Sequence, residues 1–248
     1  MRRETQNVLL ILLGGALVKI ALNGDYLRYV KPAQQLWIIA GGAVMLLLGA
    51  AAIVRDIATA RAAAKAAHES EADTDHSHGH HHPARSAWLL VVPVLAVFLV
   101  APPALGADSV TRTEARLPAS AATTSAAAFP PLPAGAVVPM AMNEVVTRAG
   151  WDANGTMNGR TVEISGFVVH TGGQTLLARL VISCCAADAA PVTVHLKGGD
   201  ADRFPSDTWL RVTGQIVPGT ATEANSYTPD LVPATVERIT APKDPYEY

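Results

Sequence analysis

The chain contains few cysteines, few aromatic residues and no large excess of charge of either sign. Its 248 residues include 2 cysteines and 5% aromatic residues, and the formal net charge is −2. Two cysteines cannot form the disulfide framework of a small secreted domain. The part after residue 105 carries 10 basic and 14 acidic residues, whereas binding of nucleic acid favours a basic groove with aromatic side chains. The composition therefore argues against a nucleic-acid partner.

Apolar residues are plentiful, and they concentrate in three runs before residue 106. Half of all residues are hydrophobic, and the runs cover 8–22, 36–54 and 87–105. A helix that crosses a bilayer needs ~20 mainly apolar residues. No small-residue cleavage site follows the first run, which argues against a removable signal peptide. We therefore expect a lipid-embedded module of three transmembrane helices over residues 1–105.

Glycines within the first two runs indicate how these helices meet. Gly14 and Gly15 lie in the first run, and Gly41, Gly42 and Gly49 lie in the second. Small residues let membrane helices approach closely. Glycine is also common in membrane helices without any packing role, so both interpretations stay open.

The distribution of basic residues predicts the orientation in the membrane. Loops on the cytoplasmic side carry more Lys and Arg. With three spans, one side holds six such residues and the other side holds four: Arg2, Arg3, Arg55, Arg61, Lys65 and Arg85 against Arg28, Lys31, Arg112 and Arg116. We expect a multi-pass protein of the plasma membrane with its C-terminal domain outside the cytoplasm.

A histidine-rich loop covers residues 68–82, between the second and third runs. It contains Glu and Asp residues followed by five closely spaced histidines: His76, His78, His80, His81 and His82. Neutral imidazoles bind zinc, nickel or copper, so the loop is a candidate for loose metal binding on the cytoplasmic side. A solvated linker with idle histidines is the alternative.

The remaining residues divide into a linker and a folded domain. Residues 106–139 are rich in Ala, Pro, Ser and Thr, which is typical of an extended linker. In residues 140–248, helical spacing over 142–151 predicts one short helix, with Asn143 as its cap. Alternating apolar residues and glycine turns predict five strands, and Pro233 suggests that the fifth is an edge strand: 161–169, 174–184, 191–196, 208–217 and 232–239. We expect a small all-β, OB-like barrel with glycine at its bends.

Both cysteines lie side by side at the end of the second predicted strand. Thiolates are soft ligands, so Cys184 and Cys185 with Asp188 can supply three ligands to zinc or another soft metal, and His195 or His170 a fourth. Cu(I) and arsenic(III) also suit two thiols. Neighbouring side chains of a strand point to opposite faces, so both thiols reach one metal only if the strand ends or bulges there. Burial as small apolar residues, a disulfide, and a catalytic nucleophile are the alternatives.

Several of these segments resemble the YcgQ-like family of bacterial membrane proteins. The resemblance rests on the His-rich loop and on four short stretches, which are 29–32 (YVKP), 183–188 (SCCAAD), 208–214 (TWLRVTG) and 245–248 (PYEY). This family is a domain of unknown function and supplies no catalytic residues. Its members are typically paired with a YcgR-type permease, so the resemblance implies an integral-membrane permease as partner.

We therefore expect a membrane-anchored accessory protein of a permease, whose outer domain binds a soft metal or metalloid. The alternative is a non-metal interaction or structural protein whose barrel docks on a partner. We do not expect an enzyme, because no spacing of residues supports a catalytic triad.

Overall fold

The computed structural model describes residues 3–69, 92, 95–96, 103–113 and 129–248. The chain forms two compact units, of which one comprises Met1–Tyr26 and Pro32–Pro102 and the other Leu27–Lys31 and Pro103–Tyr248. The short loop between the first two helices thus belongs to the C-terminal unit. The histidines of the predicted loop, 76–82, lie outside the described residues.

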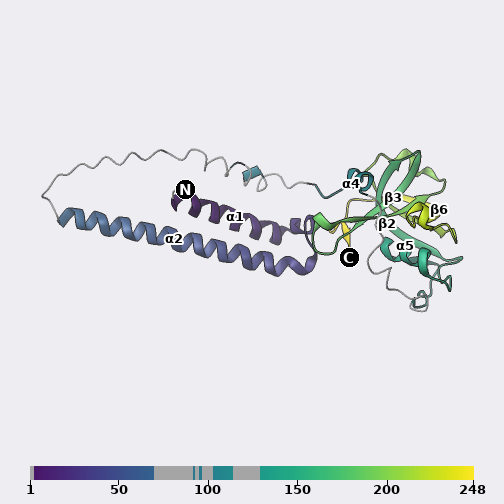
Figure 1. Cartoon of the computed structure of the whole chain (residues 1–248), viewed down its shortest axis with the longest axis horizontal. Coiled ribbons are helices and arrows are strands. Elements are labelled where there is room, and N and C mark those ends of the chain that lie inside the picture. The colour runs from purple at the N-terminus through teal and green to yellow at the C-terminus, as the bar shows by residue number, and fades with distance from the viewer. Residues whose placement is uncertain (1–2, 70–91, 93–94, 97–102, 114–128) are drawn as a thin grey trace. The chain divides into compact units, whose positions relative to one another are not determined.

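Two helices of the first unit are long and apolar enough to cross a membrane. They are α1 (Arg3–Asn23) and α2 (Gln35–Glu69), and the apolar segments within them are Gln6–Asn23 and Pro32–Lys65. The helices run side by side (Figure 1). The short helices η1 (Asp25–Arg28) and η2 (Pro32–Gln34) join them. The third predicted helix, 87–105, falls mostly outside the described residues.

Three of the five glycines let the backbones of α1 and α2 approach closely. A methyl group on Gly14 would lie 2.8 Å from the Gly42 carbonyl oxygen, and one on Gly49 would lie 2.8 Å from Ile11. Gly15 and Gly41 meet no described atom within 4 Å. The packing interpretation is therefore confirmed for Gly14, Gly42 and Gly49.

The C-terminal unit is an all-β domain, and its described residues include two short α-helices of six and ten residues. Five strands close on themselves in the order β2-β5-β6-β4-β3, because β2 also pairs with β3. β4 and β6 run parallel, and the other pairs in this ring are antiparallel. The elements are β1 (Val137–Pro139), α5 (Met142–Trp151), β2 (Thr161–Thr171), β3 (Gln174–Val181), β4 (Ala190–Leu196), β5 (Trp209–Ile216), β6 (Asp230–Arg238) and β7 (Tyr246–Glu247).

Alternate residues of the five strands fill the interior. Val162, Val194 and Leu210 are fully buried there, and α5 contributes Met142 and Val145. Glycine is needed where strands bend sharply, since a Cβ on residue 166 would lie 2.6 Å from the Ala178 carbonyl oxygen.

A second apolar layer lies on the outer side of β2 and β3. Phe167 and Leu180 are buried there under Ala107 and Val110 of helix α4 (Ala107–Arg112), and Tyr246 of β7 joins them. Both ends of the segment interpreted as a linker are thus ordered elements, namely α4 and β1. Composition alone did not reveal this packing.

The prediction that Pro233 marks an edge strand was wrong. β6 lies between β5 and β4, and Pro233 pairs with Gly214 beside an irregularity in the register. Proline lacks a backbone N–H. At a bulge the hydrogen-bond ladder is already interrupted, so proline is tolerated there inside a sheet.

The prediction that Asn143 caps α5 was also wrong. The carboxylate of Glu247 accepts hydrogen bonds from the N–H groups of Met142 (2.9 Å) and Asn143 (2.7 Å). A negative charge at this end of a helix offsets its unpaired N–H groups. The cap therefore comes from the far end of the chain.

Glu247 also accompanies a buried arginine of β3. Arg179 is 8% exposed, its Nε lies 3.5 Å from Glu247 Oε1, and its guanidinium lies 4.9 Å from the centre of the Trp209 ring. Burial lowers the pKa of Arg179, although the negative charge of Glu247 acts in the opposite direction. The C-terminal tail thus compensates a charge inside the domain.

Candidate functional site

The cysteine turn, residues 183–188, brings both thiols of the chain together. β3 ends at Val181, and a 3₁₀ helix covers Ala186–Asp188. The strand therefore ends before the cysteines, as the prediction of a shared site required. Cys184 Sγ lies 3.6 Å from Cys185 Sγ, so the two are free thiols in contact rather than a disulfide.

Asp188 organises this turn through its carboxylate. Oδ1 accepts from Ser183 N–H at 2.7 Å, while Oδ2 accepts from Cys184 N–H at 2.7 Å and from Cys185 N–H at 3.4 Å. A short acidic side chain that binds the backbone of its own loop is a common turn device. Among the backbone hydrogen bonds, Oδ2 accepts two and Oδ1 accepts one, so Oδ1 keeps an acceptor site.

The cysteine turn gathers three groups that can bind a metal. One ligand atom each from Cys184, Cys185 and Asp188 lies within 4.8 Å of the other two. Cys184 and Asp188 are exposed and Cys185 is half-buried, so an ion has access from solvent. Among the described residues, this arrangement unites three of the predicted ligands.

The two thiols and the carboxylate also affect one another's protonation. The hydrogen bond to Asp188, followed by that to Cys185, raises the pKa of Cys184 to about 11. Desolvation acts to raise the pKa of Asp188, but hydrogen bonds from the Cys184 thiol and from backbone N–H groups outweigh it and lower the pKa. The free site therefore holds a protonated thiol beside a carboxylate at neutral pH.

The two histidines considered as a fourth ligand lie elsewhere in hydrogen bonds of their own. His195 Nδ1 is 3.0 Å from Asp230 Oδ1. His170 contacts Thr175 Oγ at 3.1 Å through Nδ1 and the Phe204 carbonyl oxygen at 2.8 Å through Nε2. Neither belongs to the group around the cysteines among the described residues. The predicted ligands His76, His78, His80, His81 and His82 lie outside the described residues.

The cysteine turn also binds the loop that joins α1 to α2. Val30 pairs with Cys185 in an isolated antiparallel bridge, and Ala186 N–H donates to the Tyr29 carbonyl oxygen at 2.7 Å. Tyr246 of β7 binds the same loop, because its hydroxyl donates to the Arg28 carbonyl oxygen at 3.0 Å. Sequence reasoning noticed the stretches 29–32, 183–188 and 245–248 separately but did not predict that they meet.

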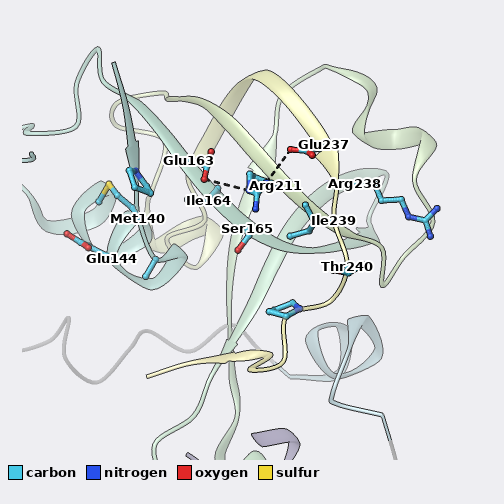
Figure 2. Close-up of a pocket in the computed structure, with 13 residues that line it drawn as sticks. Met140, Glu144, Glu163, Ile164, Ser165, Arg211, Glu237, Arg238, Ile239 and Thr240 are labelled. Atoms are coloured by element: carbon cyan, nitrogen blue, oxygen red, sulfur yellow. Dashed lines mark hydrogen bonds and ion pairs between the residues drawn. The ribbon is translucent and has the colours of Figure 1, made fainter. Parts of the chain in front are cut away.

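A cavity of about 760 Å³ lies beside β2, β5 and β6 and contains an arginine between two glutamates. Arg211 lies 3.7 Å from Glu163 and 3.3 Å from Glu237. Figure 2 shows Arg211 between these carboxylates and Arg238 pointing away from them. The charge of Arg211 is thus already offset by these two carboxylates.

Comparisons with known proteins identify the family. A search of curated proteins finds no match. The DUF1980 N-terminal domain matches residues 5–115, and the DUF1980 C-terminal domain matches residues 151–248. These two matches contain α1 and α2 at one end, and the five closed strands, the cysteine turn and β7 at the other. The chain therefore belongs to the uncharacterised DUF1980 family.

Proposed function

We propose that this protein is a membrane-anchored accessory protein of a permease, and that its extracytoplasmic domain captures a soft metal or metalloid at the cysteine turn. One observation carries the proposal: two accessible thiols 3.6 Å apart with a carboxylate in reach. Adjacent thiols prefer soft ions such as Zn²⁺, Cu(I) or arsenic(III).

The number of donors favours capture and release over a structural metal. Structural zinc sites are closed by four protein ligands, whereas sites that exchange a ligand keep a position open. Cys184, Cys185 and Asp188 make three donors. An ion held there keeps room for a ligand from solvent or from a partner.

A thiol enzyme is the less favoured interpretation. A catalytic cysteine needs a lowered pKa, because the thiolate is the nucleophile. The pKa of Cys184 is raised to about 11 by Asp188. This disfavours Cys184 as a catalytic nucleophile.

The connection between units supports the predicted three-helix topology. Leu27–Lys31 and Pro103–Tyr248 belong to one compact unit, which supports a topology with both segments on the same side of the membrane. If α1 and α2 both cross, α2 carries the chain away from that side. The chain must then cross again before Pro103, and the apolar run 87–105 is the stretch suited to it. The His-rich loop would lie on the cytoplasmic side, where it binds metal loosely.

The barrel itself fits the OB type that the sequence suggested. Its order, β2-β3-β4-β6-β5 and back to β2, and the parallel pair β4–β6 support this assignment. The resemblance to the YcgQ-like family supports the permease as partner.

The test is metal content of the full-length protein, purified in detergent without oxygen. Four proteins are compared. The chain with the tract His76–His82 and the chain without it are each prepared with both cysteines and as the double variant Cys184→Ser/Cys185→Ser. Removing the tract first prevents its imidazoles from obscuring the second site. We expect about one zinc or copper ion per chain in the tract-free protein and none in its cysteine variant.

The opposite outcome identifies the alternative function. If the tract-free protein with both cysteines holds no more zinc, copper or arsenite than the cysteine variant, the metal-capture proposal is wrong. The barrel is then better interpreted as a docking module with structural cysteines.

A further inference from the structure

A groove on the outer side of β3 and β4 has the properties of a second binding site. It has a volume of about 590 Å³, and strands, loops and helix α4 of the C-terminal unit line it. This volume lies in the range of pockets that hold small molecules. We call it the β3–β4 groove, and it contains none of the three cysteine-turn ligands.

Strand β4 presents polar side chains to the groove at every second position. Thr193 and His195 of β4 and Lys197 directly after it line the groove, while Val194 and Leu196 between them are buried in the core. The two faces of one strand thus serve separate purposes. The groove side has donors and acceptors where the core side is apolar.

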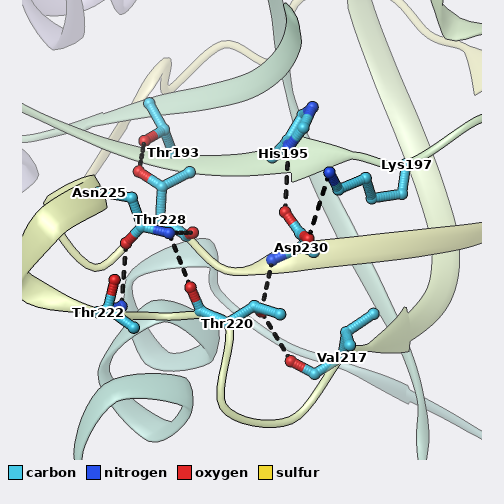
Figure 3. Close-up of polar contacts among 9 residues, drawn as sticks. All are labelled: Thr193, His195, Lys197, Val217, Thr220, Thr222, Asn225, Thr228 and Asp230. Carbon is cyan, nitrogen blue, oxygen red and sulfur yellow. Dashed lines mark hydrogen bonds and ion pairs between the residues drawn. The ribbon is translucent and has the colours of Figure 1, made fainter.

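Three ionisable groups meet at the floor of the groove. His195 Nδ1 lies 3.0 Å from Asp230 Oδ1, and Lys197 Nζ lies 3.5 Å from Asp230 Oδ2. Figure 3 shows both side chains directed at this carboxylate. A carboxylate can only accept, so His195 donates to Asp230 through Nδ1–H. In the neutral form of the ring, Nε2 is then the acceptor that a ligand hydroxyl can use. The His195 side chain is 14% exposed and that of Lys197 is 49% exposed.

The loop 217–229, which lines the groove through Asn225, Ser226 and Thr228, is held in a strained conformation. Ser226 and Tyr227 have φ values of 53° and 57°, which non-glycine residues rarely adopt. The Asn225 amide holds the loop by donating to the carbonyl oxygens of Thr220 (2.7 Å) and Thr228 (3.0 Å). The Tyr227 ring stacks on Trp151, with ring centres 4.5 Å apart. Strain that the surroundings enforce in this way is concentrated at binding sites.

The chemistry of the groove favours a neutral ligand with many hydroxyl groups. The positive charge of Lys197 and the negative charge of Asp230 compensate each other. Threonine hydroxyls add groups that both donate and accept, such as the Thr193–Thr228 pair at 2.7 Å. Among the described residues that line the groove, none is aromatic, which disfavours nucleobases because these bind by stacking.

We propose that the β3–β4 groove binds a short neutral saccharide. His195 Nε2 and Asp230 accept from its hydroxyl groups, while Lys197 and the threonines donate to its oxygens. The place agrees with the proposal, because OB-type barrels bind oligosaccharides on their second and third strands and the flanking loops. These strands are β3 and β4 here, and the flanking loops contribute Thr171 and Asn225.

The test is calorimetric titration of the full-length protein in phospholipid nanodiscs, since glycosidic detergents would compete. The probes are maltose, cellobiose, trehalose and sucrose, with inorganic phosphate and acetate as charged controls. We expect at least one disaccharide to bind and neither anion to do so. His195→Gln should weaken that binding about tenfold.

A matched pair of variants separates binding from folding. Thr193→Val/Thr228→Val removes a hydroxyl pair from the groove, and replacement of both partners leaves neither unsatisfied. Thr213→Val/Thr235→Val removes a similar pair, 2.6 Å apart, that does not line the groove. We expect the first to weaken disaccharide binding about tenfold and the second to leave it unchanged. The proposal is overturned if no disaccharide binds, or if the two double variants bind the disaccharide with equal affinity. Binding of phosphate or acetate in place of a disaccharide would also overturn it.

Discussion

Asp188 controls the reactivity of the neighbouring thiol. Because its carboxylate raises the pKa of Cys184 to about 11, removal of the negative charge should lower that pKa and increase the thiolate fraction. We expect Asp188→Asn to react faster with iodoacetamide at pH 8, by roughly 10- to 100-fold if the pKa returns towards its ordinary value.

The Cys185→Ser background assigns this rate to Cys184. A plot of rate against pH should be displaced to lower pH in Asp188→Asn. An unchanged plot would show that the carboxylate has no influence on the thiol.

The same protonated thiol should make the proposed metal capture depend on pH. A divalent ion must displace the Cys184 proton, so its apparent association constant should rise about tenfold per pH unit, from neutral pH up to about 11, for that one proton. A metalloid hydroxide behaves differently, because the thiol proton leaves with the hydroxide as water and no free proton is released. Competition titrations between pH 6 and pH 8 on the protein without His76–His82, with zinc and with arsenite, measure both slopes. A zinc affinity independent of pH would contradict the proton count.

At the scale of elements, β7 has a stabilising role beyond its two residues. Glu247→Gln should lower the free energy of unfolding by about 1–3 kcal/mol, because it weakens the α5 cap and leaves buried Arg179 without a compensating charge. Glu237→Gln is the matched control. Its carboxylate is 66% exposed and pairs with Arg211 on the surface, where such pairs contribute about 0–1 kcal/mol.

Thermal unfolding of the full-length variants followed by fluorescence measures both changes. Equal stability of the two variants would mean that the tail is not a structural cap.

The hydroxyl of Tyr246 joins the α1–α2 loop to the barrel. It donates to the Arg28 carbonyl oxygen at 3.0 Å and accepts from Leu105 N–H at 3.3 Å. Tyr246→Phe should therefore increase hydrogen exchange at amides of Leu27–Lys31, while Tyr248→Phe should not, because its hydroxyl binds Asp244. Mass spectrometry of exchanged peptides tests this. Equal exchange in both variants would show that the Tyr246 hydroxyl does not hold the loop.

Local patterns predicted the strands but not the contacts between distant irregular segments. Period-two alternation placed all five strands within a few residues of their observed bounds, and the glycine at position 166 was correctly assigned to a bend. Glu247 caps a helix about a hundred residues earlier in the chain, and Val30 pairs with Cys185. Neither contact leaves a periodic signal, because each joins a single residue of a turn or tail to its partner. The proximity of Asp188 to the two cysteines was predictable, because Cys184 and Asp188 are four residues apart and this separation fits a turn.

For the whole molecule, the two cysteines provide a direct test of membrane orientation. They are the only thiols in the chain, and both lie in the C-terminal unit. A membrane-impermeant maleimide added to intact cells at pH 8 should label the protein through the exposed Cys184.

The control carries Ser77→Cys in the Cys184→Ser/Cys185→Ser background. It places the single thiol in the His-rich loop, which we expect on the cytoplasmic side, so labelling should require permeabilised cells. The reverse pattern would place the C-terminal unit in the cytoplasm.

The position of β7 after every other described element has a consequence for biosynthesis. The amides at the start of α5 and the guanidinium of Arg179 are synthesised before Glu247, so they lack this partner until β7 has been made. The loop Leu27–Lys31 is made long before Tyr246, and the two meet only once β7 exists. Formation of α1 and α2 can therefore precede completion of the C-terminal unit. A quality-control protease would meet an incomplete barrel until β7 has been synthesised.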